Sequence, residues 1–375
     1  MSADLLIGVY PPMAPRAILR RPAPPLFPFN QPGLALTHLG RGAAWLALRA
    51  LGLGPGSRIA MPSYHCGSEV EAARLAGCEI DFYRVDANLQ VDREDLARVA
   101  ANSDAAYLIS YFGFEIPARP AGVLVIEDAA HALFSDAADG PIGSRGDAAV
   151  FCPRKTVGVP DGGAVLLRTG PSPATEGHPN TYAMLRSAAS LLAGRAAISH
   201  SRHLRSAASR LIAKTSRADA AARSGELTEV VIGEWDLEVG DMEAAASGPA
   251  PLTARIVDRT DGAGVRAARR RNYEILLKGG LGEYAPEPFR HLPPGVAPLY
   301  FPLSVNDREA TLIRLLDRGI RGLEVWPVPH PLLDRQQFSQ LEPARSNLLA
   351  LPVHQLLEPW HMDLVLTAAK SALIR

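Results

Sequence analysis

The fold is decided by two stretches of sequence, GVLVIEDAAHALF at residues 122–134 and GDAAVFCPRKTVGVPDGGAVLL at residues 146–167. Each stretch contains a short apolar run, at residues 122–126 and 148–152, that leads directly into polar residues. Such short apolar runs predict strands that are covered on both faces. The polar residues then follow strand ends, which is where α/β sheets place their ligand-binding groups.

Strand and helix patterns alternate around these two stretches. Further strands are predicted at residues 58–62, 79–85, 106–111 and 164–167, and helices at residues 42–53, 69–76 and 92–101. Asp92 is a suitable N-cap for the last of these helices. The alternation predicts an α/β fold with a mostly parallel sheet and helices on both of its faces.

The chain is expected to have three parts. Residues 1–34 form a proline-rich N-terminal arm, residues 35–255 a large domain, and residues 256–375 a smaller C-terminal α+β domain. Within the large domain, residues 171–255 are rich in Ala, Ser and Arg and are expected to be helical and divergent. In the small domain, the run Arg269, Arg270 and Arg271 is interpreted as a solvated helix face, with a substrate phosphate site as the alternative.

Composition restricts the class of protein. The 375 residues carry 39 basic and 39 acidic side chains, and this zero net charge argues against a nucleic-acid-binding protein. No apolar run approaches the roughly 18–20 residues that span a bilayer. The three cysteines are too few for a disulfide framework and lack the CxxC spacing of a metal site. We therefore expect a cytoplasmic protein with neither a metal nor a membrane segment.

Three features of the sequence suggest a specific chemistry. Only four of the 39 basic residues are lysines, and Lys155 is one of them, directly after an apolar run. Asp128 follows another such run, and Gly40 and Arg41 precede a predicted helix whose free N–H groups favour an anion. A lysine, an aspartate and a helix N-terminus are what pyridoxal 5'-phosphate (PLP) requires for its aldehyde, its ring nitrogen and its phosphate.

The sequence also resembles the DegT/DnrJ/StrS family of PLP-dependent aminotransferases, which have the aspartate-aminotransferase fold (fold type I). The resemblance covers about residues 38–168 and 265–375. It is carried by GRGAAWLALRALGLGPG (40–56), RIAMPSYHCGSEVEAARLAGCEIDFYRVD (58–86), YFGF (111–114), VIEDAAHALF (125–134), IGSRGDAAVFCPRKTVGVPDGGAVLL (142–167) and LALPVHQLL (349–357).

The resemblance implies roles for individual residues. Lys155 is the Schiff-base lysine and general base, Asp128 is the partner of the pyridine nitrogen, and His131 contacts the phenolic oxygen of the cofactor. The phosphate turn corresponds to Gly40, Arg41 and Gly42.

Three departures from the family pattern accompany these matches. Cys66 stands at the position of the ring-stacking aromatic, and the nearest rings in sequence are those of Tyr64 and His65. The serine that usually precedes the lysine is missing, and we expect Arg154 to hold the phosphate in its place. No Asn-Tyr-Arg segment occurs in residues 171–255.

The implied activity is transfer of an amino group from an amino acid, glutamate being the expected donor, to a keto-sugar that is expected to be nucleotide-linked. Such a reaction serves polysaccharide or secondary-metabolite biosynthesis, and the implied assembly is a homodimer. Two alternatives stay open: a PLP-dependent lyase or dehydratase acting on a sugar, and a non-catalytic scaffold with this fold. The lysine at 155 argues against the family's dehydratases, which have a histidine there.

Overall fold

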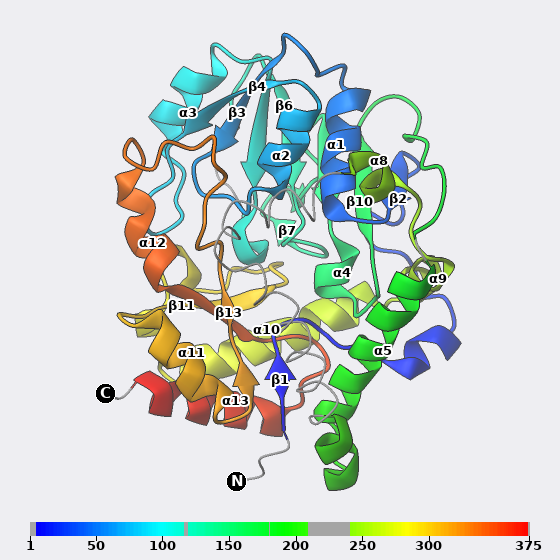
Figure 1. The fold of residues 1–375 in the computed structure, drawn as a ribbon, viewed down its shortest axis with the longest axis vertical. Helices are drawn as coiled ribbons and strands as arrows, with labels where there is room; N and C mark the ends of the chain where they lie inside the picture. Colours follow the sequence, from blue (N-terminus) through cyan, green and yellow to red (C-terminus); the bar gives the residue numbers. More distant parts are fainter. Residues whose placement is uncertain (1–4, 116–118, 180, 209–240, 374–375) are drawn as a thin grey trace, which may run out of the picture.

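The computed structural model describes residues 5–115, 119–179, 181–208 and 241–373. Its larger part is built on a seven-stranded sheet with the strand order β2-β10-β9-β6-β5-β3-β4 (Figure 1). The strands are β2 (Leu34–Thr37), β3 (Arg58–Pro62), β4 (Glu79–Tyr83), β5 (Ala105–Ile109), β6 (Leu124–Asp128), β9 (Ala148–Phe151) and β10 (Gly163–Leu167).

Most neighbouring strands of this sheet run parallel. The pairs β3–β4, β3–β5, β5–β6 and β6–β9 are parallel, whereas β10 is antiparallel to both β9 and β2. The predicted α/β class with a mostly parallel sheet is therefore confirmed. Strand β2 was not predicted, because its four residues are too few to show a period-two pattern.

Helices connect the strands of the large sheet. These are α1 (Gly40–Ala50), α2 (Ser68–Leu75), α3 (Arg93–Ala100) and the short α4 (Pro153–Thr156). Helix α1 packs on β9 and β10, and α3 packs on β3 and β4. Asp92 caps α3 as predicted, because its side chain accepts a hydrogen bond from the N–H of Asp95.

Some boundaries differ from those predicted. The strand expected at residues 122–126 is displaced to Leu124–Asp128, because Gly122 has a positive φ of 77° that no strand accommodates. Glu127 and Asp128 are therefore the last residues of the strand rather than the first residues after it. Helix α1 likewise begins at Gly40, so that Arg41 lies in its first turn.

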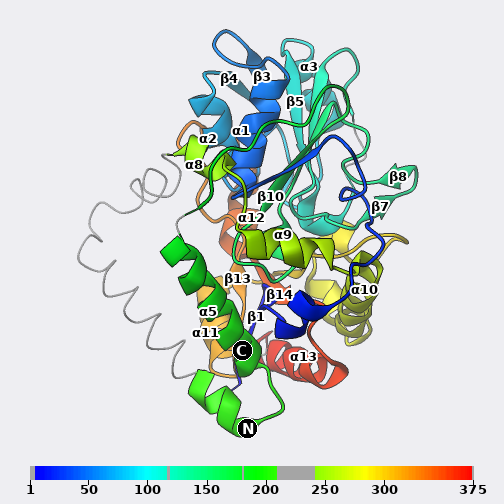
Figure 2. The same cartoon turned by 90° about the vertical axis from the view of Figure 1, so that its right-hand side faces the viewer.

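The described part of the region between the two sheets contains helices joined by irregular segments such as residues 171–179. It contains α5 (Thr181–Ala197), α8 (Met242–Ala246) and α9 (Pro251–Asp258), and residues 209–240 of the predicted divergent region lie outside the described residues. Helix α8 packs on α1, and α5 runs along one edge of the molecule (Figures 1 and 2).

A smaller unit lies below the large sheet in Figure 1. It consists of the antiparallel sheet β11-β14-β13 and the helices around it. Its elements are α10 (Gly262–Lys278), β11 (Tyr300–Ser304), α11 (Arg308–Leu316), β12 (Ile320–Arg321), β13 (Leu323–Glu324), α12 (Glu342–Asn347), β14 (Leu348–Pro352) and α13 (Pro359–Leu373).

The N-terminal arm joins this smaller unit. Strand β1 (Ile7–Gly8) pairs in parallel with β12, although more than 300 residues separate them in sequence. A short hairpin, β7 (Asp136–Ala137) and β8 (Gly140–Pro141), lies beside the large sheet. One continuous apolar core, from Ile59 in β3 to Leu349 in β14, runs through both units. None of the helices in the described residues is long and apolar enough to cross a membrane.

Candidate active site

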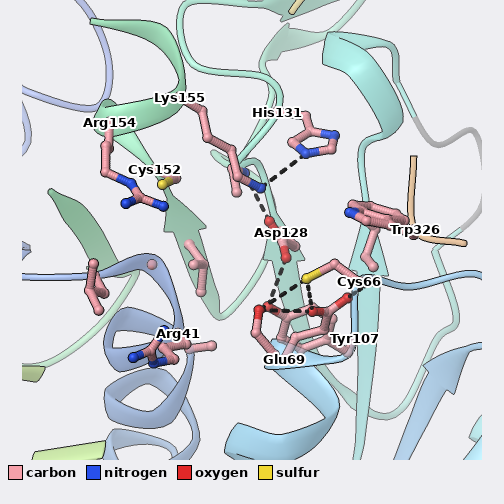
Figure 3. Close-up of a pocket in the computed structure, with 17 residues that line it drawn as sticks. Arg41, Cys66, Glu69, Tyr107, Asp128, His131, Cys152, Arg154, Lys155 and Trp326 are labelled. Carbon is pink, nitrogen blue, oxygen red and sulfur yellow. Dashed lines mark hydrogen bonds between the residues drawn. The ribbon is translucent and has the colours of Figure 1, made fainter. Parts of the chain in front are cut away.

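A cavity of about 120 Å³ opens where the parallel strands end at their carboxyl termini (Figure 3). Strands β5 and β6, helices α1, α2 and α4, and the segment after β13 contribute its walls. The cavity is lined by Leu39, Gly40, Arg41, Ala44, Cys66, Ser68, Glu69, Tyr107, Ile109, Asp128, Ala130, His131, Val150, Cys152, Arg154, Lys155 and Trp326.

Lys155 extends into this cavity from α4. The helix has only four residues and begins with Pro153, whose fixed φ suits the first helical position. The Nζ atom of Lys155 lies 3.0 Å from Nε2 of His131. Burial lowers the pKa of the amine, but Cys152, Cys66, Tyr10 and Asp128 raise it, and the net pKa lies above its ordinary value. The amine is therefore protonated at neutral pH.

Asp128 lies at the end of β6, and its carboxylate is buried. One oxygen accepts a hydrogen bond from the N–H of Ala130 at 2.8 Å, and the other accepts from the hydroxyl of Tyr107 at 2.9 Å. Burial raises the pKa of Asp128 to about 6, with Glu69 adding to the rise and Ala130, Lys155 and Tyr107 opposing it. The carboxylate is consequently ionised at neutral pH but protonated in mild acid.

His131 is enclosed by aromatic rings. Its imidazole stacks on Phe112 at an interplanar angle of 13° and on Trp326 at 29°. Burial, followed by the charge of Lys155, holds the pKa of His131 well below its ordinary value. The imidazole is therefore neutral, and its Nε2 atom can accept a hydrogen bond from the ammonium group of Lys155.

The opposite end of the cavity is suited to an anion. Helix α1 begins there with Gly40 and Arg41, and its N-cap residue Leu39 has no side chain that could cap the N–H groups. Arg154 enters from α4, and its side chain extends on the side of the cavity that faces α1 (Figure 3). Arg154 is exposed to solvent, whereas Arg41 is half-buried.

Gly42 does not line the cavity, although it was predicted as part of the phosphate turn. A Cβ atom at this position would lie only 2.1 Å from the carbonyl oxygen of Ala245 in α8. Gly42 is therefore needed where α1 and α8 approach each other closely. Gly40 differs, since a Cβ there would make an ordinary 3.5 Å contact with the side chain of Cys152.

Tyr64 and His65 also lie outside the cavity lining, contrary to the predicted contact with a cofactor ring. Both side chains are fully buried and already have partners. The Tyr64 hydroxyl donates to the carbonyl of Val325 at 2.8 Å. The imidazole of His65 bonds to the carbonyl of Pro62 at 2.9 Å and accepts from the N–H of His330 at 3.1 Å. The small unit thus occupies the positions where a ligand was expected.

Trp326, from the smaller unit, lines the cavity together with the ring of Tyr107. It follows β13 and has a positive φ of 45°, which is strained for a tryptophan. Its carbonyl accepts a hydrogen bond from Arg345 at 3.1 Å, and the hydroxyl of Tyr64 holds the preceding residue. The sequence offered no signal for Trp326, because 260 residues separate it from Cys66 across the cavity.

A second buried carboxylate, Glu69, was also missed. Its Oε2 atom accepts a hydrogen bond from the thiol of Cys66 at 2.7 Å, and its Oε1 atom accepts from the N–H of Cys66 at 3.0 Å. Burial raises the pKa of the Cys66 thiol, so it stays neutral. An acid in the first turn of a helix normally indicates a solvated partner of the helix dipole, which is why the sequence did not single out Glu69.

The described residues contain no group of three or more His, Cys, Asp or Glu side chains that could hold a metal ion. The three cysteines are free, with Cys78 and Cys152 buried and Cys66 half-buried.

Comparison with known proteins agrees with this architecture. The sequence model of the DegT/DnrJ/EryC1/StrS aminotransferase family matches residues 35–172. A DegT/DnrJ/EryC1/StrS aminotransferase from Brucella abortus has 17% identity and a TM-score of 0.61, with 91% of this chain and 86% of that chain covered.

Two further structures have the same fold. A candidate sugar aminotransferase from Streptococcus pneumoniae, solved in a PLP form, has 14% identity and a TM-score of 0.64, with 98% and 100% of the two chains covered. The sugar aminotransferase CalS13 from Micromonospora echinospora has 18% identity and a TM-score of 0.58, with 97% and 99% covered. Residues 35–172 thus match the DegT/DnrJ/EryC1/StrS aminotransferase family model, and the chain as a whole has the fold of these aminotransferases, fold type I.

Proposed function

We propose that this protein is a sugar aminotransferase in which Lys155 carries PLP. The observation that carries the proposal is the meeting of Lys155, Asp128 and the N-terminus of α1 in one cavity. These groups come from three separate elements, and each matches a different part of the cofactor. The family match and the fold shared with aminotransferases support the same activity.

The set of donors around the cavity fits this cofactor. A primary amine can bond to its aldehyde, a buried carboxylate can pair with its ring nitrogen, and the first turn of α1 with Arg41 and Arg154 can hold its phosphate. The small side chains of Ala130 and Cys66 also line the cavity. When bound, the cofactor withdraws electrons from the carbon atom that carries the amino group.

The residues of the chain then have distinct tasks. In its neutral form the Nζ atom of Lys155 would take a proton from that carbon atom of the donor and, once protonated, would supply a proton to the corresponding carbon atom of the acceptor. Asp128 keeps a proton on the ring nitrogen through its negative charge, and His131 orients the amine of Lys155 through the 3.0 Å contact. Glu69, Cys66 and Trp326 form part of the cavity wall.

The proposed substrates are glutamate as the amino donor and a nucleotide-linked keto-sugar as the acceptor. A sugar acceptor is supported by the similarity to the sugar aminotransferase CalS13.

We also propose a cytoplasmic homodimer. Exposed apolar side chains on α5, Leu185 at 65% and Leu192 at 41%, support an interface with a second copy. Sedimentation of a fully active monomer would exclude the dimer.

The cofactor assignment is tested by borohydride reduction of the PLP-treated protein, followed by peptide mapping. We expect the label on Lys155 and its loss in Lys155→Ala, with the fold retained. A label on Lys214, Lys278 or Lys370 would contradict the assignment. An unlabelled protein would instead favour the non-catalytic scaffold.

The reaction type is tested with ¹⁵N-glutamate and a panel of keto-sugar nucleotides. We expect mass spectrometry to find the heavy nitrogen in an amino-sugar product, together with 2-oxoglutarate. Release of the nitrogen as ammonia, or loss of water from the sugar without amination, would favour a lyase or dehydratase.

A further inference from the structure

Arg269 is buried completely, although the sequence predicted a solvated helix face for this arginine and its two neighbours. Its guanidinium group donates to four acceptors. The Nη1 atom donates to the carbonyls of Pro298 at 3.2 Å and Leu299 at 3.0 Å, and Nη2 donates to the carbonyl of Thr156 at 3.2 Å. The Nε atom donates to Oε1 of Gln355 at 3.1 Å.

In the described part of the chain, no carboxylate forms an ion pair with Arg269. Burial lowers the pKa of Arg269 to about 10, so the group is still charged at neutral pH. A buried charge without a counter-ion is costly unless hydrogen bonds compensate for the lost water. The four acceptors supply that compensation, and one of them, the carbonyl of Thr156, belongs to α4.

Thr156 is the last residue of α4 and the residue next to Lys155. The carbonyls at the end of a helix lack partners within the helix, and α4 is too short to satisfy its own. The Thr156 carbonyl accepts from Arg269 and also from Nε2 of Gln355 at 2.9 Å. Both donors come from the smaller unit, and each also bonds to the other. We call these three residues the Thr156 clamp.

We infer that the Thr156 clamp is a positioning device for Lys155, and that Arg269 is its central residue. The inference rests on the proposed role of Lys155 as the cofactor lysine. The clamp fixes the carbonyl that follows Lys155 and thereby fixes the turn from which its amine reaches His131. A lysine at position 269 could not replace the arginine, because its ammonium lacks the planar fork that donates in several directions at once.

Gln355→Glu separates positioning from simple structural support. The new carboxylate forms an ion pair with Arg269, so the melting temperature should stay the same or rise. A carboxylate cannot donate to the carbonyl oxygen of Thr156, and its negative charge repels that oxygen. The hydrogen bond between residue 355 and Thr156 should therefore be lost. Arg269→Met removes the charge and the remaining donors. The matched control is Arg270→Gln, since Arg270 donates to the carbonyls of Pro293 and Val296, away from α4.

The readout is reductive methylation of Lys155 in cofactor-free protein, measured by peptide mass spectrometry relative to Lys278, whose side chain is 79% exposed. In Gln355→Glu we expect the Lys155/Lys278 rate ratio to rise about tenfold, which corresponds to loss of about one hydrogen bond. PLP linkage should weaken by a similar factor. Arg270→Gln should change neither quantity.

An unchanged rate ratio in Gln355→Glu would overturn the inference, because the clamp would then support the fold without positioning the lysine. If Arg269→Met fails to fold, Gln355→Glu still decides the question. The methylation readout does not depend on PLP. A changed ratio in a protein that never links PLP would support the clamp and refute the proposed function.

Discussion

The Nζ atom of Lys155 lies 3.0 Å from Nε2 of His131, and the charge of Lys155 adds to burial in keeping the pKa of the imidazole low. The buried neutral imidazole accepts a hydrogen bond from the ammonium group without removing its proton, so Lys155 stays charged. The Nδ1 atom of His131 lies 3.4 Å from the N–H of Phe112. When Lys155 loses its proton, the ring proton of His131 can move from Nδ1 to Nε2. The Nε2 atom then donates to the amine of Lys155, and Nδ1 accepts from the N–H of Phe112.

The rate at which Lys155 captures PLP should therefore rise with pH across the range above neutrality. The amine must be neutral to react, and its pKa lies above the ordinary value. His131→Phe keeps a ring between Phe112 and Trp326 but removes the acceptor for the ammonium, which lowers the pKa of Lys155. Stopped-flow absorbance should show the pH profile shifted to lower pH in this variant. An unshifted profile would mean that His131 does not act on the amine.

Asp128→Asn should stabilise the cofactor-free protein at neutral pH. Folding raises the pKa of this carboxyl from about 3.8 to about 6, so its ionisation costs stability as the pH rises through this window. The asparagine avoids this cost and can still bond to Ala130 and Tyr107. We expect a gain of about 2–3 kcal/mol at pH 7.5 that disappears near pH 4.

The stabilised Asp128→Asn protein should hold PLP less tightly and react very slowly, because a neutral amide cannot keep the ring nitrogen protonated. Denaturant melts at both pH values test the stability, and PLP titration tests the binding. The control is Asp147→Asn, where the pKa of the carboxyl is lowered on folding despite the opposing effect of burial. That substitution should destabilise the protein at neutral pH. A stability gain for Asp128→Asn that is equal at both pH values would contradict the electrostatic cause.

Arg154→Ala should weaken PLP affinity by about three- to tenfold and change the rate at saturating cofactor much less. The side chain is exposed, so water screens its charge and the loss is smaller than for a buried charge-assisted hydrogen bond. Titration of cofactor-free protein measures this loss. Arg93→Ala, in the exposed first turn of α3, serves as the control. Equal affinity in the wild type and Arg154→Ala would remove Arg154 from the phosphate site.

Gly42→Ala should destabilise the protein by about 1–3 kcal/mol, the usual cost of overpacking. Its Cβ would meet the backbone of α8 at 2.1 Å, and backbone atoms cannot move aside as a side chain can. Gly40→Ala, two residues earlier, should leave the stability nearly unchanged, because its Cβ would lie 3.5 Å from the side chain of Cys152, an ordinary van der Waals contact. Thermal melting of both variants tests the contrast. Equal losses would show that α1 itself, rather than its contact with α8, is sensitive to substitution.

Much of the sheet and part of the site could be predicted because the signals are local. Period-two patterns and short apolar runs indicate strands, and Asp92 caps its helix through a neighbour three residues away. The meeting of Asp128 and Lys155 could also be predicted, because residues at the carboxyl ends of adjacent parallel strands lie together at one edge of the sheet.

Other properties of the protein depended on contacts between distant segments. Arg269 stands in an arginine run that is typical of a solvated helix face, but it is buried and donates to the carbonyl of Thr156, 113 residues away. Tyr64 and His65 have the sequence position of cofactor contacts, but the smaller unit covers them at Val325 and His330. Trp326 enters the cavity for the same reason. The sequence by itself thus determined the strands and the polar residues at their ends, because backbone sterics and side-chain periodicity act over a few residues. The tertiary structure alone decided which polar and aromatic side chains are buried, because burial depends on which surfaces meet.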